Sequence, residues 1–281
     1  MRISRQPSRA ARLTTGVFGA ALLLALPTSA LAQYGAPELS SSTIGENYHI
    51  EASGRLWTPD VFGQISSEQF GIIGSKVDFA DDLGFEKTRF KDFRLVLRPS
   101  KKTKFRIQHT PVSYTAETAL KREFVFNGQT YPIALPLQSQ FDWNVWRLGI
   151  EYDAFYRPRG YVGFLIEARY TEMYAELRSP VRPTEFRREK APLPAIGIVG
   201  RAYPLPALAI NFEMSTFNVP KDAIPNIEAN YYDWDINGTF NVNRYLGVEV
   251  GWRRMTNYLS IKKDVGDTKF QGMYFGGALR Y

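Results

Sequence analysis

Arginines and carboxylates recur at every second position of segments that are otherwise apolar. In residues 245–256, for example, Glu249 and Arg253 alternate with Val248 and Val250. The planar guanidinium of arginine can donate two parallel hydrogen bonds to a carboxylate, which suits a partly dry interior better than the ammonium group of lysine. Buried charges are costly unless they are paired, so the pattern predicts an internal charge network. The predicted network has arginines and acids in near balance and no lysine; it contains Glu51, Arg55, Arg94, Arg106, Arg147, Glu151, Glu167, Arg169, Arg201, Glu213, Asp233, Asp235, Glu249 and Arg253.

The same alternation predicts β-strands, because successive side chains of a strand point to opposite faces of the sheet. In residues 160–177 one face carries Val162, Phe164 and Ile166, and the other carries Glu167. A soluble β-sandwich or barrel would bury the apolar face and expose the charged one. The charged face here combines ionic side chains with small ones, which favours a polar interior and an apolar exterior.

The C-terminal stretch, Asp267 to Tyr281, places Met273, Phe275 and Leu279 on one face of a strand. An apolar alternation that runs to an aromatic last residue exposes apolar side chains and an unpaired edge, unless one face meets lipid and the strand pairs with the first strand. This stretch resembles the terminal strand of bacterial outer-membrane β-barrel proteins. The resemblance implies an all-β fold, a closed antiparallel transmembrane β-barrel, in the bacterial outer membrane.

Turn signals divide the chain into alternating short and long connectors, which is typical of the short periplasmic turns and long extracellular loops of such barrels. Ten strands are the preferred count, within a range of eight to twelve, and an even count leaves both termini in the periplasm. Asn127-Gly128 predicts a type I′ turn in a hairpin that projects well above the membrane. Residues 58–86 could add an outer hairpin. The predicted strands are 47–57, 87–98, 103–126, 130–155, 160–177, 194–203, 206–217, 229–240, 245–256 and 267–281.

The N-terminal residues predict an export signal. Four arginines precede a short apolar run at residues 17–26, and Ala30-Leu31-Ala32 offers a cleavage site. Without the four arginines of this signal the formal net charge falls from +7 to +3, so a nucleic-acid partner is not expected. The chain has no cysteine, which excludes a disulfide framework and a thiolate metal site. The predicted organisation is a cleaved signal peptide at 1–32, a periplasmic lead at 33–46 and a transmembrane β-barrel at 47–281.

Aromatic residues predict where the barrel meets the two membrane interfaces. The chain has 16 tyrosines and 5 tryptophans, and such residues form girdles at both interfaces of outer-membrane barrels. The assigned strand directions place the predicted girdle residues Trp146, Tyr170, Trp234 and Trp252 at the outer end of the apolar face, and Tyr48 and Tyr281 at its inner end.

Residues 178–194 predict a basic, proline-punctuated loop at the outer end of the barrel. Its arginines Arg182, Arg187 and Arg188 could pair with the phosphates of an anionic lipid such as lipopolysaccharide. The alternative is a mobile, solvated loop, and the sequence favours neither.

The candidates for catalysis are few. His49 and His109 are the only histidines, and the strand register places them on different faces and at different heights. Outer-membrane barrels of the omptin protease and lipid A deacylase types have a histidine-based site near the outer rim, and no Ser/His or Asp/His arrangement in the predicted outer loops matches either.

Residues 77–85 (VDFADDLGF) resemble a stretch of many uncharacterised outer-membrane barrels. Their clustered aspartates could bind a divalent cation, but the spacing is not that of an EF-hand loop. We predict no catalytic residue, no cofactor and no metal.

Three hypotheses for function follow. The first is a non-enzymatic barrel with a charge-paired polar lumen, either a narrow passive pore or a structural protein of the envelope; ten strands lie close to the size that side chains fill. The second is a surface-binding protein that uses its outer loops to bind lipopolysaccharide or another ligand. The third is an enzyme that modifies outer-leaflet lipid. The expected partners are outer-membrane lipid, lipopolysaccharide and, through the C-terminal strand, the barrel-insertion machinery.

Overall fold

The computed structural model describes residues 43–67, 74–261 and 264–281, except for the side chains of Arg182 and of residues 221–224. The predicted signal peptide and most of the predicted lead lie outside the described residues. Within the described part, no helix is long and apolar enough to cross a membrane. The strands are β1 (Ile50–Trp57), β2 (Asp60–Ser66), β3 (Val77–Asp78), β4 (Phe90–Leu97), β5 (Thr103–Ala119), β6 (Phe124–Phe126), β7 (Gln129–Tyr131), β8 (Pro136–Arg157), β9 (Gly160–Ser179), β10 (Arg182–Leu205), β11 (Leu208–Ile224), β12 (Ile227–Asn241), β13 (Leu246–Ile261) and β14 (Asp264–Arg280).

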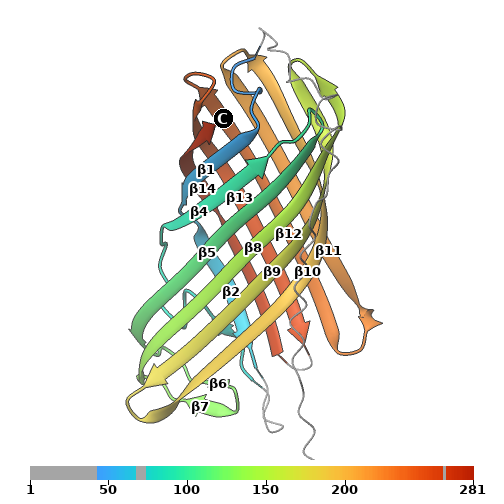
Figure 1. Ribbon diagram of the computed structural model, residues 1–281. Coiled ribbons are helices and arrows are strands. Elements are labelled where there is room, and N and C mark those ends of the chain that lie inside the picture. The colour runs from blue at the N-terminus through green and yellow to red at the C-terminus, as the bar shows by residue number, and fades with distance from the viewer. Residues whose placement is uncertain (1–42, 68–73, 262–263) are drawn as a thin grey trace, which may run out of the picture. The chain divides into compact units, whose positions relative to one another are not determined.

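Ten of the described strands form a closed antiparallel barrel (Figure 1). Each strand pairs with the next in the order β1, β4, β5, β8, β9, β10, β11, β12, β13, β14. The sheet closes because β1 also pairs with β14, from Glu51↔Arg280 to Trp57↔Tyr274. β2 then pairs with the next part of β14 and so lengthens the same wall. These pairings confirm the predicted all-β closed barrel and its ten strands.

The barrel has two different ends. We call the end that carries Tyr281 the proximal end; it has four tight turns, at residues 98–102, 158–159, 206–207 and 242–245. The opposite end, which carries β6 and β7, is the distal end (Figure 1). The proximal turns lie where the sequence predicted short connectors.

At the distal end, the predicted basic loop at 178–194 is wrong, because most of it is paired strand. β9 and β10 stay paired out to Arg182↔Ser179. The prolines suggested a loop, since proline lacks the N–H group that a sheet hydrogen bond needs. β10 pairs with β11 only from Ile196 towards the proximal end. The edge of β10 that faces β11 is therefore unpaired in the distal part of the strand. A proline on that edge does not remove a hydrogen bond between strands.

The predicted tall hairpin around Asn127-Gly128 is interrupted. β5 and β8 pair only as far as Ala119↔Pro136, and the residues between them form the separate hairpin β6–β7. Asn127 and Gly128 have positive φ angles of 51° and 76°, so the tight turn itself lies where the sequence predicted it.

A distal core of apolar side chains explains the interruption. Residues 77–90 enter the distal half of the barrel, where the Phe79 ring lies 4.7 Å from that of Phe141, and Phe124 and Phe126 of β6 are buried against the same core. Burying these aromatic side chains outweighs continued pairing of β5 with β8. The distal core consists of Trp57, Val61, Val77, Phe79, Leu83, Phe85, Phe90, Val112, Tyr114, Leu120, Phe124, Phe126, Tyr131, Leu135, Leu137, Phe141, Trp143, Val145, Leu177, Tyr231, Met255, Phe270 and Tyr274.

The exterior of the proximal half is an apolar belt to which all ten barrel strands contribute. Phe164 and Ile166 of β9, for example, are 60% and 67% exposed. A continuous apolar exterior of this kind is unfavourable in water and suited to lipid. On β9 the belt runs from Val162 to Tyr170, close to the ~9–11 residues that a strand needs to cross a bilayer, and the strand then continues to Ser179.

We predict that Phe79→Ala lowers the free energy of unfolding by about 3–5 kcal/mol, because it leaves a cavity in the distal core. The measurement is urea-induced unfolding of the refolded protein in lipid vesicles, followed by tryptophan fluorescence. Phe186→Ala, at a side chain that is 60% exposed on β10, is the matched control. Equal effects of the two substitutions would show that residues 77–90 do not stabilise the barrel.

Candidate functional site

The structure places all fourteen residues of the predicted charge network inside the barrel. Each of their side chains is at most 11% exposed and lies within 4.0 Å of an oppositely charged group. They come from every barrel strand except β14. The alternation of the strands is the reason, since the closed sheet turns every second side chain inward.

Glu213 of β11 is a carboxylate shared by three arginines of the network. Arg94 lies 3.1 Å from its Oε2 atom, and Arg106 and Arg147 donate hydrogen bonds to its two oxygens. Arg147 also donates from Nε and Nη2 to Glu167, at 2.9 and 2.6 Å. One carboxylate thus joins arginines of β4, β5 and β8 across the interior.

A second centre lies around Asp233 of β12. Arg253 donates to it from Nε at 3.1 Å and from Nη2 at 2.9 Å, the two-pronged geometry expected of an arginine–carboxylate pair. The remaining nitrogen of Arg253 donates to Asp92 of β4 at 3.0 Å. Gln108 and Thr110 of β5 complete the shell of Asp92 with hydrogen bonds of 2.8 and 2.5 Å.

Arg55 of β1 forms a third centre. Its Nε donates to Glu249 at 2.8 Å, and its Nη1 lies 3.5 Å from Asp235. The guanidinium lies 4.9 Å from the centre of the Tyr274 ring, and the Tyr274 hydroxyl donates to Asp235 at 2.7 Å. Pairing of this quality is what makes buried charges tolerable.

The expectation that lysine is absent from the interior is wrong. Lys104 of β5 is 1% exposed, and its ammonium group lies 2.6 Å from Glu151 and 3.0 Å from Asp153. It also lies 3.5 Å from the centre of the Tyr161 ring. A compact ammonium group with three donors can serve several partners around a point, where an arginine would need a planar arrangement. Lys104 lies two positions before Arg106 and therefore on the same face of the strand, so the alternation alone could have identified Lys104 as an interior residue.

Residues 43–49 cross the proximal end as a strap. Ile44 N donates to the carbonyl of Pro206 at 2.7 Å, in the turn between β10 and β11. Glu46 points into the barrel, where Arg98 and Arg201 lie at 3.1 and 3.2 Å from its carboxylate and the Tyr203 hydroxyl donates to it at 2.8 Å. Sequence reasoning missed Glu46 because it precedes the first strand and so carries no strand phase.

The geometry of the strap depends on Gly45. Its φ angle is +83°, and a Cβ atom there would lie 2.7 Å from the side chains of Arg280 and Asn241. Arg280, on the charged phase of the last strand, donates to Glu51 and to Asn241. Glycine therefore lets the strap lie directly on the network.

The space left inside the charge network is small. The hollow bordered by Glu51, Arg106 and Glu213 has a volume of about 40 Å³, room for a very few water molecules. Around this hollow, charged side chains thus occupy most of the space.

The girdle residues fall on the exterior with one exception. Trp146, Tyr170 and Tyr281 are 46%, 44% and 83% exposed. Trp234 and Trp252 are half-buried, because their rings pack against each other at 4.6 Å. Tyr48 is the exception and a correction: it is 3% exposed and lies beneath Arg98 and Arg280 inside the barrel. It precedes β1, so the strand alternation does not fix its side.

Arg187 and Arg188, two of the three arginines predicted to contact anionic lipid, do not lie on one surface. Arg187 points inward and donates to the side chain of Asn127. Arg188 points outward, over the Tyr174 ring at 5.0 Å. The side chain of Arg182 lies outside the described residues.

Among the described residues, neither histidine lies within a group of catalytic side chains. His109 faces outward and stacks on Trp146 at 4.2 Å. His49 lies at the proximal end, where its backbone N–H donates to the carbonyl of Tyr281. The two residues lie at different heights, as predicted. His49 is exposed, so the prediction that the two histidines lie on opposite faces of the wall is not confirmed.

The aspartate cluster is used for local structure. Asp78 Oδ1 accepts hydrogen bonds from the backbone of Ala80 and Asp81. Asp82 pairs with Arg122, and this hydrogen bond raises the pKa of the guanidinium. In the described part of the chain, no group of three metal-ligating side chains is placed to hold an ion.

The fold has clear relatives among solved structures. The outer membrane protease OmpT of Escherichia coli aligns over 83% of this chain and 96% of its own, with a TM-score of 0.55 and 13% sequence identity. The fold is that of an outer-membrane β-barrel. At this identity the likeness concerns the fold alone, while the apolar belt independently requires lipid around this barrel.

Two further structures align with lower TM-scores. Ail of Yersinia pestis, solved with the heparin analogue sucrose octasulfate, aligns over 83% of this chain and 99% of its own, with 8% identity and a TM-score of 0.36. The toluene transporter TodX of P. putida aligns over 83% and 90%, with 6% identity and a TM-score of 0.36. No protein-family model and no curated protein matches the sequence.

We predict that Glu213→Gln lowers the free energy of unfolding by about 3–5 kcal/mol, since it keeps the shape of the side chain but leaves three buried arginines without their shared counter-charge. Urea-induced unfolding in lipid vesicles measures the loss. Glu117→Gln, at an exposed carboxylate that accepts a hydrogen bond from Gln138, is the control and should change stability by about 0.5 kcal/mol or less. A Glu213→Gln protein as stable as this control would mean that the network is not needed for stability.

Proposed function

We propose that this outer-membrane barrel is a closed, non-enzymatic structural protein of the envelope that holds a folded distal head above the membrane. The observation that supports this most directly is the filling of the lumen by the charge network. Arginines and carboxylates of neighbouring strands and of strands across the interior are joined there by direct hydrogen bonds of 2.6–3.3 Å. An aqueous pathway would have to break several of these pairs, and each broken pair would leave a buried charge without compensation.

A narrow passive pore is the less favoured alternative. A conducting pore needs a continuous water-filled path, whereas the hollow among the charges has a volume of about 40 Å³. On the proximal side of this hollow the strap obstructs a water path through the lumen, and on the distal side the aromatic side chains of the distal core do so.

The enzyme hypothesis also has less support. Histidine is the usual acid–base group near neutral pH, and the sequence has histidines only at positions 49 and 109. His109 stacks on the exterior Trp146, on the outer face of the barrel. A scaffold therefore fits the geometry better than a hydrolase.

We predict that the refolded mature chain gives no discrete current steps in a planar lipid bilayer, because the ion-paired interior is closed. A general porin inserted in the same membranes is the positive control, and the mobility difference between boiled and unboiled samples verifies folding. Discrete, salt-dependent steps from the folded protein would overturn the closed-barrel proposal and favour the pore.

A second candidate function is binding of lipopolysaccharide at the exterior of the barrel. Arg89, Lys91, Arg254 and Lys269 lie on the outward face of neighbouring walls, just distal to the apolar belt. Arg254 stands opposite Trp234 of the girdle. No other described residue forms a salt bridge with any of these four. Phosphates of an anionic outer leaflet would meet such cations at this height.

We predict that the double variant Lys91→Gln/Arg254→Gln binds lipopolysaccharide-containing vesicles at least about fivefold more weakly than the parent protein at moderate ionic strength. Surface plasmon resonance against captured vesicles measures the change. Lys101→Gln/Lys102→Gln removes the same charge from a proximal turn and should leave binding unchanged. If both double variants lose the same affinity, the contact reflects net charge and not a site.

A further inference from the structure

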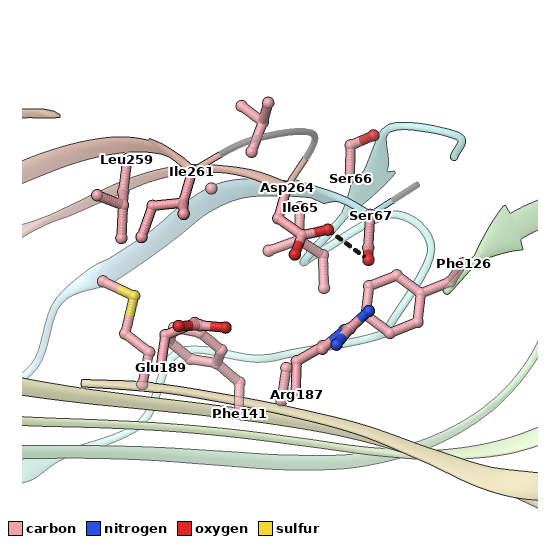
Figure 2. A pocket seen from close by; sticks show the side chains of 14 residues that line it. Ile65, Ser66, Ser67, Phe126, Phe141, Arg187, Glu189, Leu259, Ile261 and Asp264 are labelled. Atoms are coloured by element: carbon pink, nitrogen blue, oxygen red, sulfur yellow. Dashed lines mark hydrogen bonds between the residues drawn. The ribbon is translucent and has the colours of Figure 1, made fainter. Parts of the chain in front are cut away.

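The distal end contains a pocket that none of the proposed functions uses. It lies inside the barrel wall beside the distal core, and residues of β2, β13 and β14 face residues of β8 and β10 across it (Figure 2). Its volume is about 100 Å³. The cavity is smaller than, but comparable with, an engineered protein cavity of about 150 Å³ that stays dry and takes up benzene or xenon.

The lining of the pocket is mainly apolar. Ile65, Met173, Leu259, Ile261 and Val265 contribute aliphatic side chains that remain partly exposed, and Phe126 and Phe141 contribute aromatic surface. Phe126 and Phe141 belong to the distal core, and Ile65 and Met173 pack against it. The sides of these side chains that face the pocket border unfilled space, in the part of the barrel expected to meet water.

The walls cannot close over this space. β13 and β14 are hydrogen-bonded to each other along their distal halves, as are β9 and β10. The spacing of the opposing walls is set by the sheet and by the distal core between them, so the pocket does not collapse as a gap under a flexible loop would. An apolar cavity held open in this way is stabilised when an apolar group enters it.

Most polar side-chain groups at the pocket already bond within the protein or face the solvent, whereas the Nε of Arg187 is buried without a hydrogen-bond partner among the described residues. Ser67 donates to Asp264 at 2.7 Å (Figure 2), Ser66 donates to the carbonyl of Gly74 at 3.2 Å, and Arg187 donates to Asn127. Glu189 is exposed at the rim. The carboxylates of Glu189 and Asp264 outnumber the guanidinium of Arg187 at the pocket, which also disfavours an anionic ligand.

We infer that the distal pocket is a binding site for a small, uncharged apolar molecule about the size of a single aromatic ring. Arg187 and Glu189 lie on the part of β10 that is not paired with β11. The pocket is therefore not sealed by continuous sheet on that side, and a ligand reaches it without crossing the charge network.

The methionines of the chain allow a sharp test. Met173 lines the pocket, Met255 is buried in the distal core, and Met273 faces outward in the apolar belt. The full mature chain in lipid nanodiscs is labelled with ¹³C at the methionine methyl groups and titrated with fluorobenzene. A bound ring should shift the Met173 methyl resonance with a saturable dose dependence, while Met273 reports non-saturable partition into lipid.

Ala175→Phe is the variant that fills the pocket, and it should remove the saturable Met173 shift or weaken binding at least about tenfold. Ala168→Phe places the same side chain on the lipid-facing side of the same strand and should retain the shift. An unchanged Met255 resonance in the variants shows that the distal core is intact. A Met173 response that follows Met273 without saturation, or one that survives Ala175→Phe, would overturn the proposal.

Discussion

A charge enclosed by a continuous sheet must find its partner inside that sheet, and the rest of this barrel depends on that constraint. A closed barrel has no edge through which a short inward-pointing side chain can reach solvent. Arg253 meets the constraint by joining Asp233 on a neighbouring strand to Asp92, which lies on a strand beyond β14 and β1. Because such bonds span non-adjacent strands, they fix the cross-section of the barrel as well as neutralising its charges. Buried ion pairs contribute little net stability when compared with apolar packing; here they specify one arrangement of the walls.

The same constraint explains where the sheet is allowed to come apart. Unpaired backbone groups are not tolerated against lipid, but they are tolerated in water or against protein. β4 and β5 stop pairing at Phe93↔His109, and His109 stacks on the girdle residue Trp146. β10 and β11 stop pairing at Ile196↔Thr216. Distal to these points residues 77–90 pack beside β5, and the free edge of β10 holds its prolines. The stretches in which neighbouring strands are unpaired thus lie at and beyond the outer girdle.

Strand periodicity predicted the barrel and its charge network well, because alternation is a local property that a closed sheet converts directly into inside and outside. It failed where a tertiary contact decided the outcome. Lys104 has the phase of the network, and only an expectation about residue type excluded it. Glu46 and Tyr48 precede the first strand, where no alternation exists to assign a side. Asn127-Gly128 predicted its own turn correctly, but not that burial of Phe124 and Phe126 would end the long strands below it.

The two halves of the barrel invert their patterning within single strands, and this inversion locates the membrane boundary. Along β8, Phe141, Trp143 and Val145 are buried inside the barrel while Asp142 and Asn144 lie on its outer face; from Trp146 onwards the apolar side chains are outside and Arg147 is inside. No bulge separates these stretches, since β8 pairs with β9 without a register shift through the change. The backbone therefore keeps one geometry while the side chains follow the solvent on each side: apolar residues point inward where water surrounds the barrel, and outward where lipid does. β8 is longer than the bilayer requires, and its apolar side chains change from the inner to the outer face at one residue. That residue therefore marks the position of the membrane interface in the sequence.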